Sequence, residues 1–261
     1  MPYPIYVIDA FTSERFAGNP AAVVLFDQYP EDVVLQAIAA ENNLAETAFP
    51  VRRSDGDWDL RWFTPTVEVP LCGHATLAST FVLFTHVIPE ARKIVFHTRQ
   101  SGQLSVHRQG DKISMDFPAK SFDRVEEDLS SLFGTETPEI YKNAAFTMVV
   151  LPDAEAVSSF VPDRSRILEL DRDGLIITAP GGSQFDCVSR FFTPAHGIDE
   201  DPVTGGAHTM IAPYWADRLG RPNLRAYQAS ARGGSMECRV ADGRVEMRGQ
   251  CAPYMSGQIE V

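Results

Sequence analysis

Short stretches of alternating hydrophobic and polar residues are the commonest pattern in this chain, and two longer stretches are hydrophobic on nearly every side. Alternation over residues 101–117, and again over 233–249, predicts strand pairs joined by glycine-containing turns. Residues 74–87 and 206–219 predict helices that are buried on all faces. The pattern therefore favours sheets that each enclose one central helix.

The two halves of the chain repeat this pattern. RWFTPTVEVPLCGHATLA (61–78) matches RFFTPAHGIDEDPVTGGAHTM (190–210), which pairs Gly73 with Gly205 at an offset of 132 residues. The strand pairs keep an offset near 132, and LAETAFP from Leu44 matches LIITAPG from Leu175 at an offset of 131. Matches in nearly constant register indicate an internal duplication.

The duplication predicts an α+β fold of two pseudo-symmetric halves. Each half is expected to be a curved, mostly antiparallel sheet wrapped around its central helix. We expect the N-terminal half at 1–118, a polar linker at about 119–131 and the C-terminal half at 132–261, with a last strand that can return to the first half. The interface of two such halves would be a cleft bordered by the two E-x-P-x-x-G turns.

Glu46 is the one charged residue in the apolar stretch 44–50. A glutamate is rarely buried without a partner, so it needs an explanation. In the repeat alignment Glu46 corresponds to Ile177, so the other half has no carboxylate at this place. Glu46 could act as base and then as acid in a proton transfer. Alternatively, it faces solvent or pairs with an arginine such as Arg61.

Two further polar residues differ between the halves. His74 aligns with Gly206, and Asp201 aligns with Val69. A helix N-terminus lowers the pKa of a histidine, so we expect a neutral His74 that polarises a substrate or shares its proton. Asp201 could orient an ammonium or hydroxyl group of a ligand. Either residue could instead cap its helix.

Both central helices are expected to begin at glycines. Gly73 with His74, and Gly205 with Gly206, place unpaired N–H groups at a positive helix end. Two such ends could bind an anion, and a small carboxylate fits better than a nucleotide because the chain lacks phosphate-binding motifs. The glycines could also serve only to tighten the turns.

Charge and cysteine content narrow the class of protein. The net charge of −12 and pI near 4.9 argue against nucleic acid or an anionic membrane as a partner. The four cysteines form no CxxC pair and predict neither a zinc site nor a disulfide framework. The apolar run 75–87 is too short to span a bilayer. We expect a soluble cytoplasmic protein without metal or cofactor.

Five stretches in order resemble the phenazine-biosynthesis PhzF-like proteins over nearly the whole chain. They are DAFTSERFAGNPAAVV (9–24), NNLAETAF (42–49), RWFTPTVEVPLCGHATLA (61–78), RFFTPAHGIDEDPVTGGAH (190–208) and YQASARGG (227–234). This family looks like the diaminopimelate epimerase fold, in which two similar halves hold the active site between them. The resemblance implies a homodimer and a fold that agrees with the duplication.

The resemblance also implies a cofactor-free isomerase. In the phenazine enzyme one glutamate moves a proton between carbons of trans-2,3-dihydro-3-hydroxyanthranilate. Glu46, His74 and Asp201 stand at that glutamate, histidine and aspartate, and the turns at Gly73-His74 and Gly205-Gly206 would hold the substrate carboxylate. The family commonly reads TGSA where this chain reads TGGA, so a serine hydroxyl is missing at Gly206.

Two other functions remain open at this point. Epimerases of this fold use two opposed cysteines, and here the matching residues are Cys72 and Thr204, which could serve an epimerase or a dehydratase of a hydroxy amino acid. A threonine hydroxyl is a poor base at neutral pH. A non-catalytic protein that binds small carboxylates is the second alternative. Further candidates for substrate contact are Asn19, Gln228 and Arg232.

Overall fold

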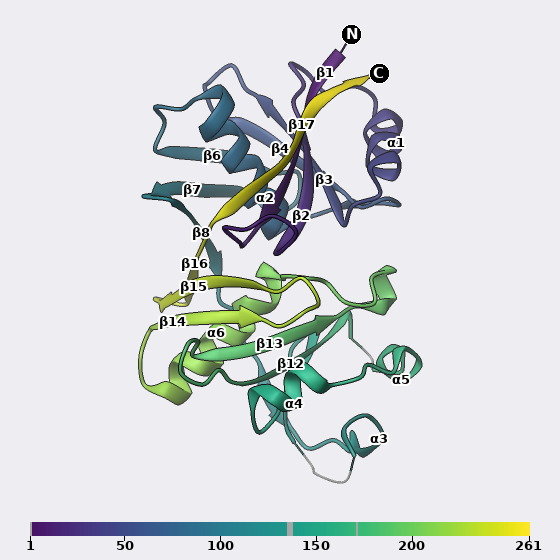
Figure 1. The fold of residues 1–261 in the computed structure, drawn as a ribbon, viewed down its shortest axis with the longest axis vertical. Coiled ribbons are helices and arrows are strands. Elements are labelled where there is room, and N and C mark those ends of the chain that lie inside the picture. The colour runs from purple at the N-terminus through teal and green to yellow at the C-terminus, as the bar shows by residue number, and fades with distance from the viewer. Residues whose placement is uncertain (1, 135–137, 171) are drawn as a thin grey trace. The chain divides into compact units, whose positions relative to one another are not determined.

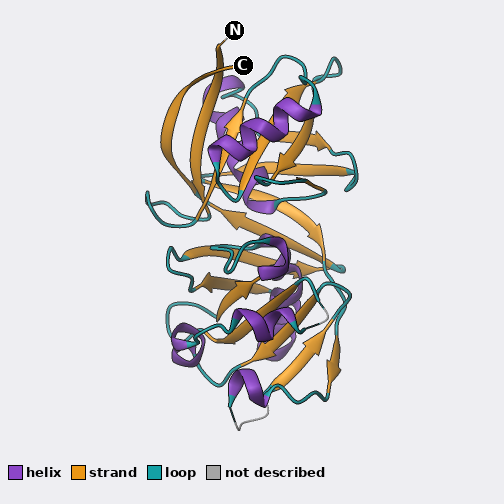
Figure 2. Ribbon diagram, turned by 90° about the vertical axis from the view of Figure 1, so that its right-hand side faces the viewer, coloured by secondary structure: helices purple, strands orange, loops and turns teal. Residues whose placement is uncertain are grey.

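The chain forms two compact units, described here from a computed structural model and drawn in Figure 1. The structure describes residues 2–134, 138–170 and 172–261. Unit 1 contains the residues up to 116 together with 247–261, and unit 2 contains 117–246. Helices and mixed strands make up both units, so the α+β class is confirmed (Figure 2).

Unit 1 is built mainly of strands, with two helices and one π-helical turn. In chain order its elements are β1 (Pro2–Ala10), β2 (Asn19–Val24), α1 (Asp32–Asn42), β3 (Glu46–Arg52), β4 (Trp58–Phe63), β5 (Glu68–Val69), α2 (Gly73–Val82), the π-helix Leu83–Val87, β6 (Lys93–His97), β7 (Gln103–Gln109), β8 (Lys112–Pro118) and β17 (Cys251–Glu260). The final strand β17 pairs antiparallel with β1, so the end of the chain completes this unit.

Unit 2 contains the remaining elements, except that the last three residues of β16 belong to unit 1, and the last two of β8 belong to unit 2. They are β9 (Asp123–Val125), α3 (Ser130–Phe133), β10 (Glu139–Lys142), β11 (Phe146–Val150), α4 (Ala154–Ser159), α5 (Arg164–Leu168), β12 (Gly174–Pro180), β13 (Cys187–Phe192), the 3-10 helix Pro194–His196, α6 (Gly205–Leu219), β14 (Asn223–Gln228), β15 (Gly234–Ala241) and β16 (Arg244–Gly249). Strand β9, which pairs with β10, lies in the segment 119–131 that the sequence analysis assigned to a linker.

Strand pairing confirms the pseudo-symmetry. In unit 1, β1–β2 is antiparallel, β2–β3 parallel, β3–β4 antiparallel, β4–β6 parallel and β6–β7 antiparallel. The pairs β10–β11, β11–β12, β12–β13, β13–β14 and β14–β15 repeat this succession in unit 2. Most pairs are antiparallel, as expected, and each unit adds two parallel pairs among the described strands.

Each sheet is covered by its central helix on one face. Helix α2 packs on β1, β2 and β3, and helix α6 packs on β14 and β15. Eight of the ten α2 residues are buried, as expected, but the predicted stretch continues as a π-helix whose residues 85–87 are exposed, and 217–219 at the end of α6 are exposed as well. The opposite face of unit 1 carries α1, whose Leu35 and Ile38 pack with Phe49 and Val51 of β3.

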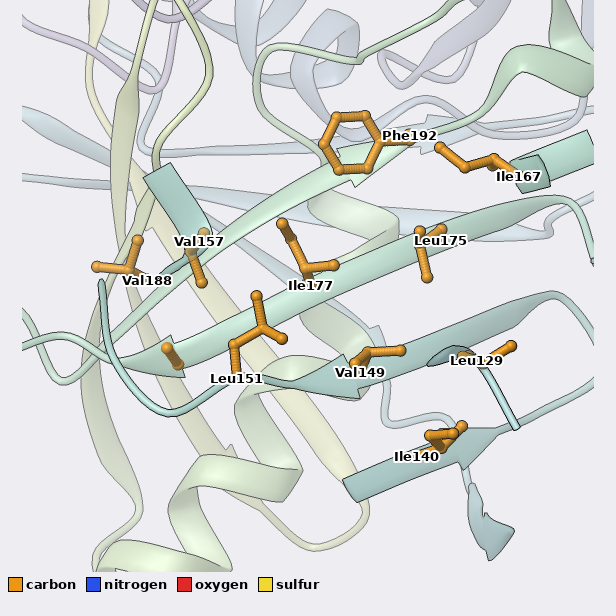
Figure 3. Packing of buried hydrophobic residues seen from close by; sticks show 11 residues of the cluster. Leu129, Ile140, Val149, Leu151, Val157, Ile167, Leu175, Ile177, Val188 and Phe192 are labelled. Carbon is orange, nitrogen blue, oxygen red and sulfur yellow. The ribbon is translucent and has the colours of Figure 1, made fainter. Parts of the chain in front are cut away.

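Shorter helices cover the opposite face of the unit 2 sheet. Figure 3 shows the apolar cluster there, with Leu175 and Ile177 of β12 packed near Val157 of α4 and Ile167 of α5. Ile176 and Thr178 therefore point to the other face, where the Trp215 indole of α6 donates a hydrogen bond to the Thr178 hydroxyl at 2.9 Å.

This register corrects the alignment of Glu46 with Ile177. Phe49 pairs with Arg61 in unit 1, and Ile177 pairs with Arg190 in unit 2, so Ile177 corresponds to Phe49. The parallel ladders are consistent with this shift. Glu46 forms the first pair of the β2–β3 ladder, with Ala21, and Gly174 forms the first pair of the β11–β12 ladder, with Phe146. Glu46 thus corresponds to Gly174. The halves still differ here, since a Cβ at Gly174 would lie 2.5 Å from the Phe191 ring.

The shared R-x-F-T-P and E-x-P residues stabilise the fold. Arg61 donates two hydrogen bonds of 2.8 Å to Glu68, and Arg190 makes the same fork to Glu200 at 2.7 and 2.8 Å. Each guanidinium also lies 4.9 Å from a ring centre, that of Phe63 or Phe192. Bidentate pairs of this kind fix the geometry of both partners. The repeated motif is therefore structural in both units.

Candidate active site

Glu46 is the first residue of β3 rather than a residue in its middle. Helix α1 ends at Asn42, and Asn43 after it has a left-handed φ of 48°. The Asn42 amide donates a hydrogen bond to the Thr47 hydroxyl at 3.1 Å. Because side chains alternate along a strand, Thr47 and Phe49 face α1 while Glu46 and Ala48 face α2. The strand thereby directs the Glu46 carboxylate to the start of α2.

His74 meets Glu46 at the start of α2. His74 Nε2 lies 3.1 Å from Glu46 Oε2. The side chain of His74 is 5% exposed and that of Glu46 is 14% exposed. Arg61, considered above as a partner of Glu46, binds Glu68 and Asp32 instead. The structure thus brings two of the three expected catalytic residues into direct contact within unit 1.

Asn19 orients the imidazole of His74. Its Nδ2 lies 3.2 Å from His74 Nδ1, and the Asn19 side chain is fully buried at the start of β2. The direction of this hydrogen bond depends on whether Nδ1 carries a proton, and the contact leaves Nε2 facing Glu46. Gly18 precedes Asn19 with φ of +64°, and a Cβ there would lie 2.2 Å from the carbonyl oxygen of Ala10.

Cys72 is the fourth side chain at this site, beside Glu46, His74 and Asn19. Its Sγ lies 3.4 Å from His74 Nδ1 and 4.0 Å from Nε2. Burial, followed by the nearby Glu46 carboxylate, raises the pKa of the Cys72 thiol. A raised pKa keeps the buried sulfur protonated at neutral pH, so little thiolate is present to act as base or nucleophile, which disfavours the chemistry that the Cys72/Thr204 alternative requires.

The expectation of a lowered pKa for His74 is wrong. Burial alone would lower it, but the contacts with Cys72 and Glu46 outweigh burial and hold the His74 pKa well above 6.5. An opposite charge at hydrogen-bond distance stabilises the imidazolium more than the helix end destabilises it. His74 therefore has a proton available to share with Glu46.

The start of α2 offers backbone donors beside this group. The first intrahelical bond runs from Thr76 N to Cys72 O at 3.1 Å, so the N–H groups of Gly73 and His74 precede the helical ladder. Such groups carry the positive end of the helix dipole and suit a carboxylate. A carboxylate, an imidazole with a raised pKa and a positive helix end are thus neighbours in unit 1.

The remaining expected site residues lie in unit 2, around the start of α6. Thr204 is the N-cap residue and donates its hydroxyl proton to Asp201 Oδ2 at 2.5 Å. Gln228 accepts from the Thr204 backbone N–H at 2.9 Å and donates to the Asp201 carbonyl oxygen at 2.7 Å. Gln228 thus holds the turn in place, a role that its position on β14 did not reveal.

Space is left at Gly206, the exposed second residue of α6. No atom lies within 4 Å of a Cβ built there, so a serine side chain fits. Ser230, which follows β14, donates a hydrogen bond to the carbonyl oxygen of Pro202 at 2.9 Å and supports the same turn. Arg232 lies two residues further along.

Two groups in the described residues have donors close enough for a metal ion. In one, Glu46, Cys72 and His74 place their ligand atoms within 4.8 Å of one another; in the other, Asp55, Asp57 and His97 do so at a more exposed position. The acidic run at 199–201 is not among them. No helix within the described ranges is long and apolar enough to cross a membrane.

Comparison with known proteins identifies relatives of the whole chain. The profile of the PhzC-PhzF family, described as phenazine biosynthesis-like protein, matches residues 8–257. An uncharacterised isomerase of Pseudomonas aeruginosa is 47% identical and one of Halalkalibacterium halodurans is 38% identical, each over at least 99% of both chains. The crystal structure of a PhzF-family protein from Enterococcus faecalis is 41% identical, with a TM-score of 0.95 over both full chains.

A more distant solved structure shares only the fold. A hydroxyproline epimerase from Agrobacterium vitis is 9% identical, with a TM-score of 0.64 over 99% of this chain and 92% of the other. This likeness confirms the expected epimerase-like architecture. At this identity it carries no information on substrate.

Proposed function

This chain belongs to the PhzC-PhzF family of phenazine biosynthesis-like proteins, and we propose that it isomerises a small carboxylate-bearing substrate with Glu46 as the acid/base. The chain is an isomerase, as its curated relatives are named. The single observation that carries the proposal is the buried contact of 3.1 Å between Glu46 Oε2 and His74 Nε2 at the start of α2.

In the proposed reaction Glu46 removes a proton from a carbon next to the carboxylate or conjugated with it. The electron pair of the broken C–H bond moves into the conjugated system. Glu46 then returns the proton to a different carbon, so substrate and product are isomers and no electron carrier or cofactor is consumed. One positioned acid/base can contribute about 10²–10⁴-fold to the rate.

Neighbouring groups support each step. The charge of the His74 imidazolium, whose Nε2 lies 3.1 Å from Oε2, attracts the Glu46 carboxylate, and Asn19 contacts the imidazole at its other nitrogen. The N–H groups of Gly73 and His74 would bind the substrate carboxylate and stabilise the negative charge that develops on it. In unit 2 we assign a substrate-orienting role to Asp201 and carboxylate binding to Gly205 and Gly206. A cyclic amino acid is the substrate class that we favour.

Deuterium incorporation tests this proposal. The protein is incubated in heavy water with a panel of small cyclic and acyclic amino and hydroxy acids, including trans-2,3-dihydro-3-hydroxyanthranilate, and exchange at carbon is read by mass spectrometry. We expect exchange by the wild type and its loss in Glu46→Gln. The matched control is Glu41→Gln, which removes an exposed carboxylate from α1 and should exchange normally.

Cys72→Ser separates the proposal from the epimerase or dehydratase alternative. Exchange that survives Glu46→Gln but is lost in Cys72→Ser would overturn the role of Glu46. Binding of a panel compound without any exchange would favour a non-catalytic protein. The homodimer and the cytoplasmic location stay predictions, and sedimentation and fractionation of the native protein test them.

A further inference from the structure

We propose that Glu46, Cys72 and His74 form a binding site for a thiophilic divalent cation of the Zn²⁺ class, and that the bound ion blocks proton transfer. The site supplies a sulfur, an imidazole nitrogen and a carboxylate oxygen, all within 4.8 Å of one another. Cysteine, histidine and acidic residues are the ligands that Zn²⁺ uses in proteins. The blocking effect rests on the proposed function, whereas ion binding does not.

The distances suit one ion shared by the three side chains. His74 Nε2 lies 3.1 Å from Glu46 Oε2 and 4.0 Å from Cys72 Sγ. In a tetrahedral zinc site with bonds of about 2.0–2.3 Å, neighbouring ligand atoms are about 3.3–3.6 Å apart. The third distance, from Cys72 Sγ to the Glu46 oxygen, is within 4.8 Å, so ion binding would draw the three side chains together around one centre. A fourth position stays open for water or a substrate oxygen.

The contact between Glu46 and His74 is compatible with a shared ion. Glu46 Oε2 is buried and lies 3.1 Å from His74 Nε2 as an ion pair, but the pair does not reach hydrogen-bond geometry within the described residues. Buried carboxylate oxygens normally accept a hydrogen bond or bind an ion or a water molecule. A cation between Oε2 and Nε2 would satisfy the oxygen directly.

Asn19 can serve as the outer support of the site. When a metal takes Nε2 of a histidine, the proton resides on Nδ1 and usually finds a carbonyl or carboxylate acceptor. The Asn19 amide lies 3.2 Å from Nδ1. Rotation of the amide by 180° would present its oxygen as that acceptor. The same residue then supports either the free or the metal-bound imidazole.

The exposed group of Asp55, Asp57 and His97 is the natural comparison. It contains no sulfur, and Arg53 already binds Asp55 and Asp59 through its guanidinium. Thiolate ligands favour zinc over magnesium and calcium. We therefore place the tight site at Cys72.

Binding of the metal ion releases protons from its ligands. The Cys72 S–H bond and the His74 Nε2–H bond break, and both protons pass to solvent. The sulfur and the freed Nε2 lone pair then form bonds to the ion, and the Glu46 carboxylate supplies the third bond. Binding should strengthen as the pH rises, because protons compete for the sulfur and nitrogen. With the ion bound, Glu46 has lost the oxygen that would accept the substrate proton.

Titration of the metal-free protein with Co²⁺ tests the site without any substrate. Co²⁺ bound to a thiolate gives charge-transfer absorption in the near ultraviolet that oxygen and nitrogen ligands do not give. We expect this absorption to saturate at one Co²⁺ per chain and to be displaced by Zn²⁺. It should vanish in Cys72→Ser and persist in Cys251→Ser, which removes another thiol, and in His97→Gln, which removes the exposed group.

The supporting role of Asn19 has its own readout. Asn19→Leu should weaken the affinity for Co²⁺ by about 10–100-fold while leaving the absorption band in place. The proposal is overturned if no charge-transfer band develops at saturating Co²⁺, or if the band survives Cys72→Ser. A band that persists unchanged in both His74→Gln and Glu46→Gln would equally overturn the three-ligand site.

Deuterium exchange then tests the blocking effect. Zn²⁺ at the concentration that saturates the site should abolish exchange, and a chelator should restore it. Exchange that continues at saturation would overturn the inhibitory part. The Co²⁺ band is measured without substrate, so failure of the proposed isomerisation and failure of the ion site give different results.

Discussion

The guanidinium of Arg61 binds both carboxylate oxygens of Glu68 at 2.8 Å while it is only 3% exposed, and the same fork recurs between Arg190 and Glu200. A buried cation that loses its partner is strongly destabilising. In Glu68→Gln, Arg61 keeps Asp32 at 2.8 Å but loses the charged fork, so the free energy of unfolding should fall by about 2 kcal/mol, as measured by urea denaturation. Asp55→Asn, which breaks an exposed pair with Arg53, is the control and should leave the urea midpoint unchanged.

Substitution at Gly206 should be accepted by the fold. Because no atom lies within 4 Å of a Cβ there, Gly206→Ser adds a side chain without a clash and restricts the unfolded chain. We expect a gain of about 0.5 kcal/mol in unfolding free energy. Gly174→Ala is the comparison variant, at a glycine without space for a side chain. The new Cβ would lie 2.5 Å from the Phe191 ring, so this substitution should destabilise unit 2 by about 1–3 kcal/mol. Equal effects of the two substitutions would contradict the packing described.

Acid should weaken unit 2 through His208. Burial lowers the pKa of His208 from 6.5 to about 4. The folded form thus stays neutral while the unfolded chain takes up a proton below pH 6.5, so stability falls as pH drops from 6.5 towards 4. The full shift corresponds to roughly 3 kcal/mol. Urea denaturation at pH 7 and pH 5 should show a smaller loss in His208→Gln than in the wild type or in His107→Gln, which alters an exposed histidine.

His74 should behave in the opposite way. Its raised pKa means that the folded form holds the proton more tightly than the unfolded chain. The resulting stabilisation is fully present below pH 6.5 and is lost as the pH rises through the folded pKa. Titration of the imidazole by NMR should place the His74 pKa above 6.5, and Glu46→Gln should lower it. A wild-type His74 that titrates below 6.5 would contradict the described contact.

Much of the fold could be predicted from the sequence because each structural motif occurs twice, once in each half of the chain. The matched Arg61 and Arg190 motifs located equivalent strands, and the apolar stretches after Gly73 and Gly205 became buried helices. Glu46 and His74 could also be singled out, because they differ between the halves.

Register and local electrostatics could not be predicted in the same way. The shared apolar letters of LAETAFP and LIITAPG favoured the alignment of Leu44 with Leu175, whereas the ladders shift the match by three residues. An odd shift moves every side chain to the other face of the sheet. Only the ladders show that Ile177 faces the outer layer and that Gly174 stands at the place of Glu46. The pKa of His74 was misjudged because its partner Glu46 comes from a distant strand.

The pairing of β17 with β1 has a consequence for how the chain is made. All residues of unit 2, from 117 to 246, are contiguous, whereas unit 1 needs residues 247–261 beside its first strand. On a ribosome, the second unit can therefore finish folding while the first still has an uncovered sheet edge along β1. The part of the protein that is synthesised first is the part that becomes complete last, and until then its open edge is the segment most in need of protection from other chains.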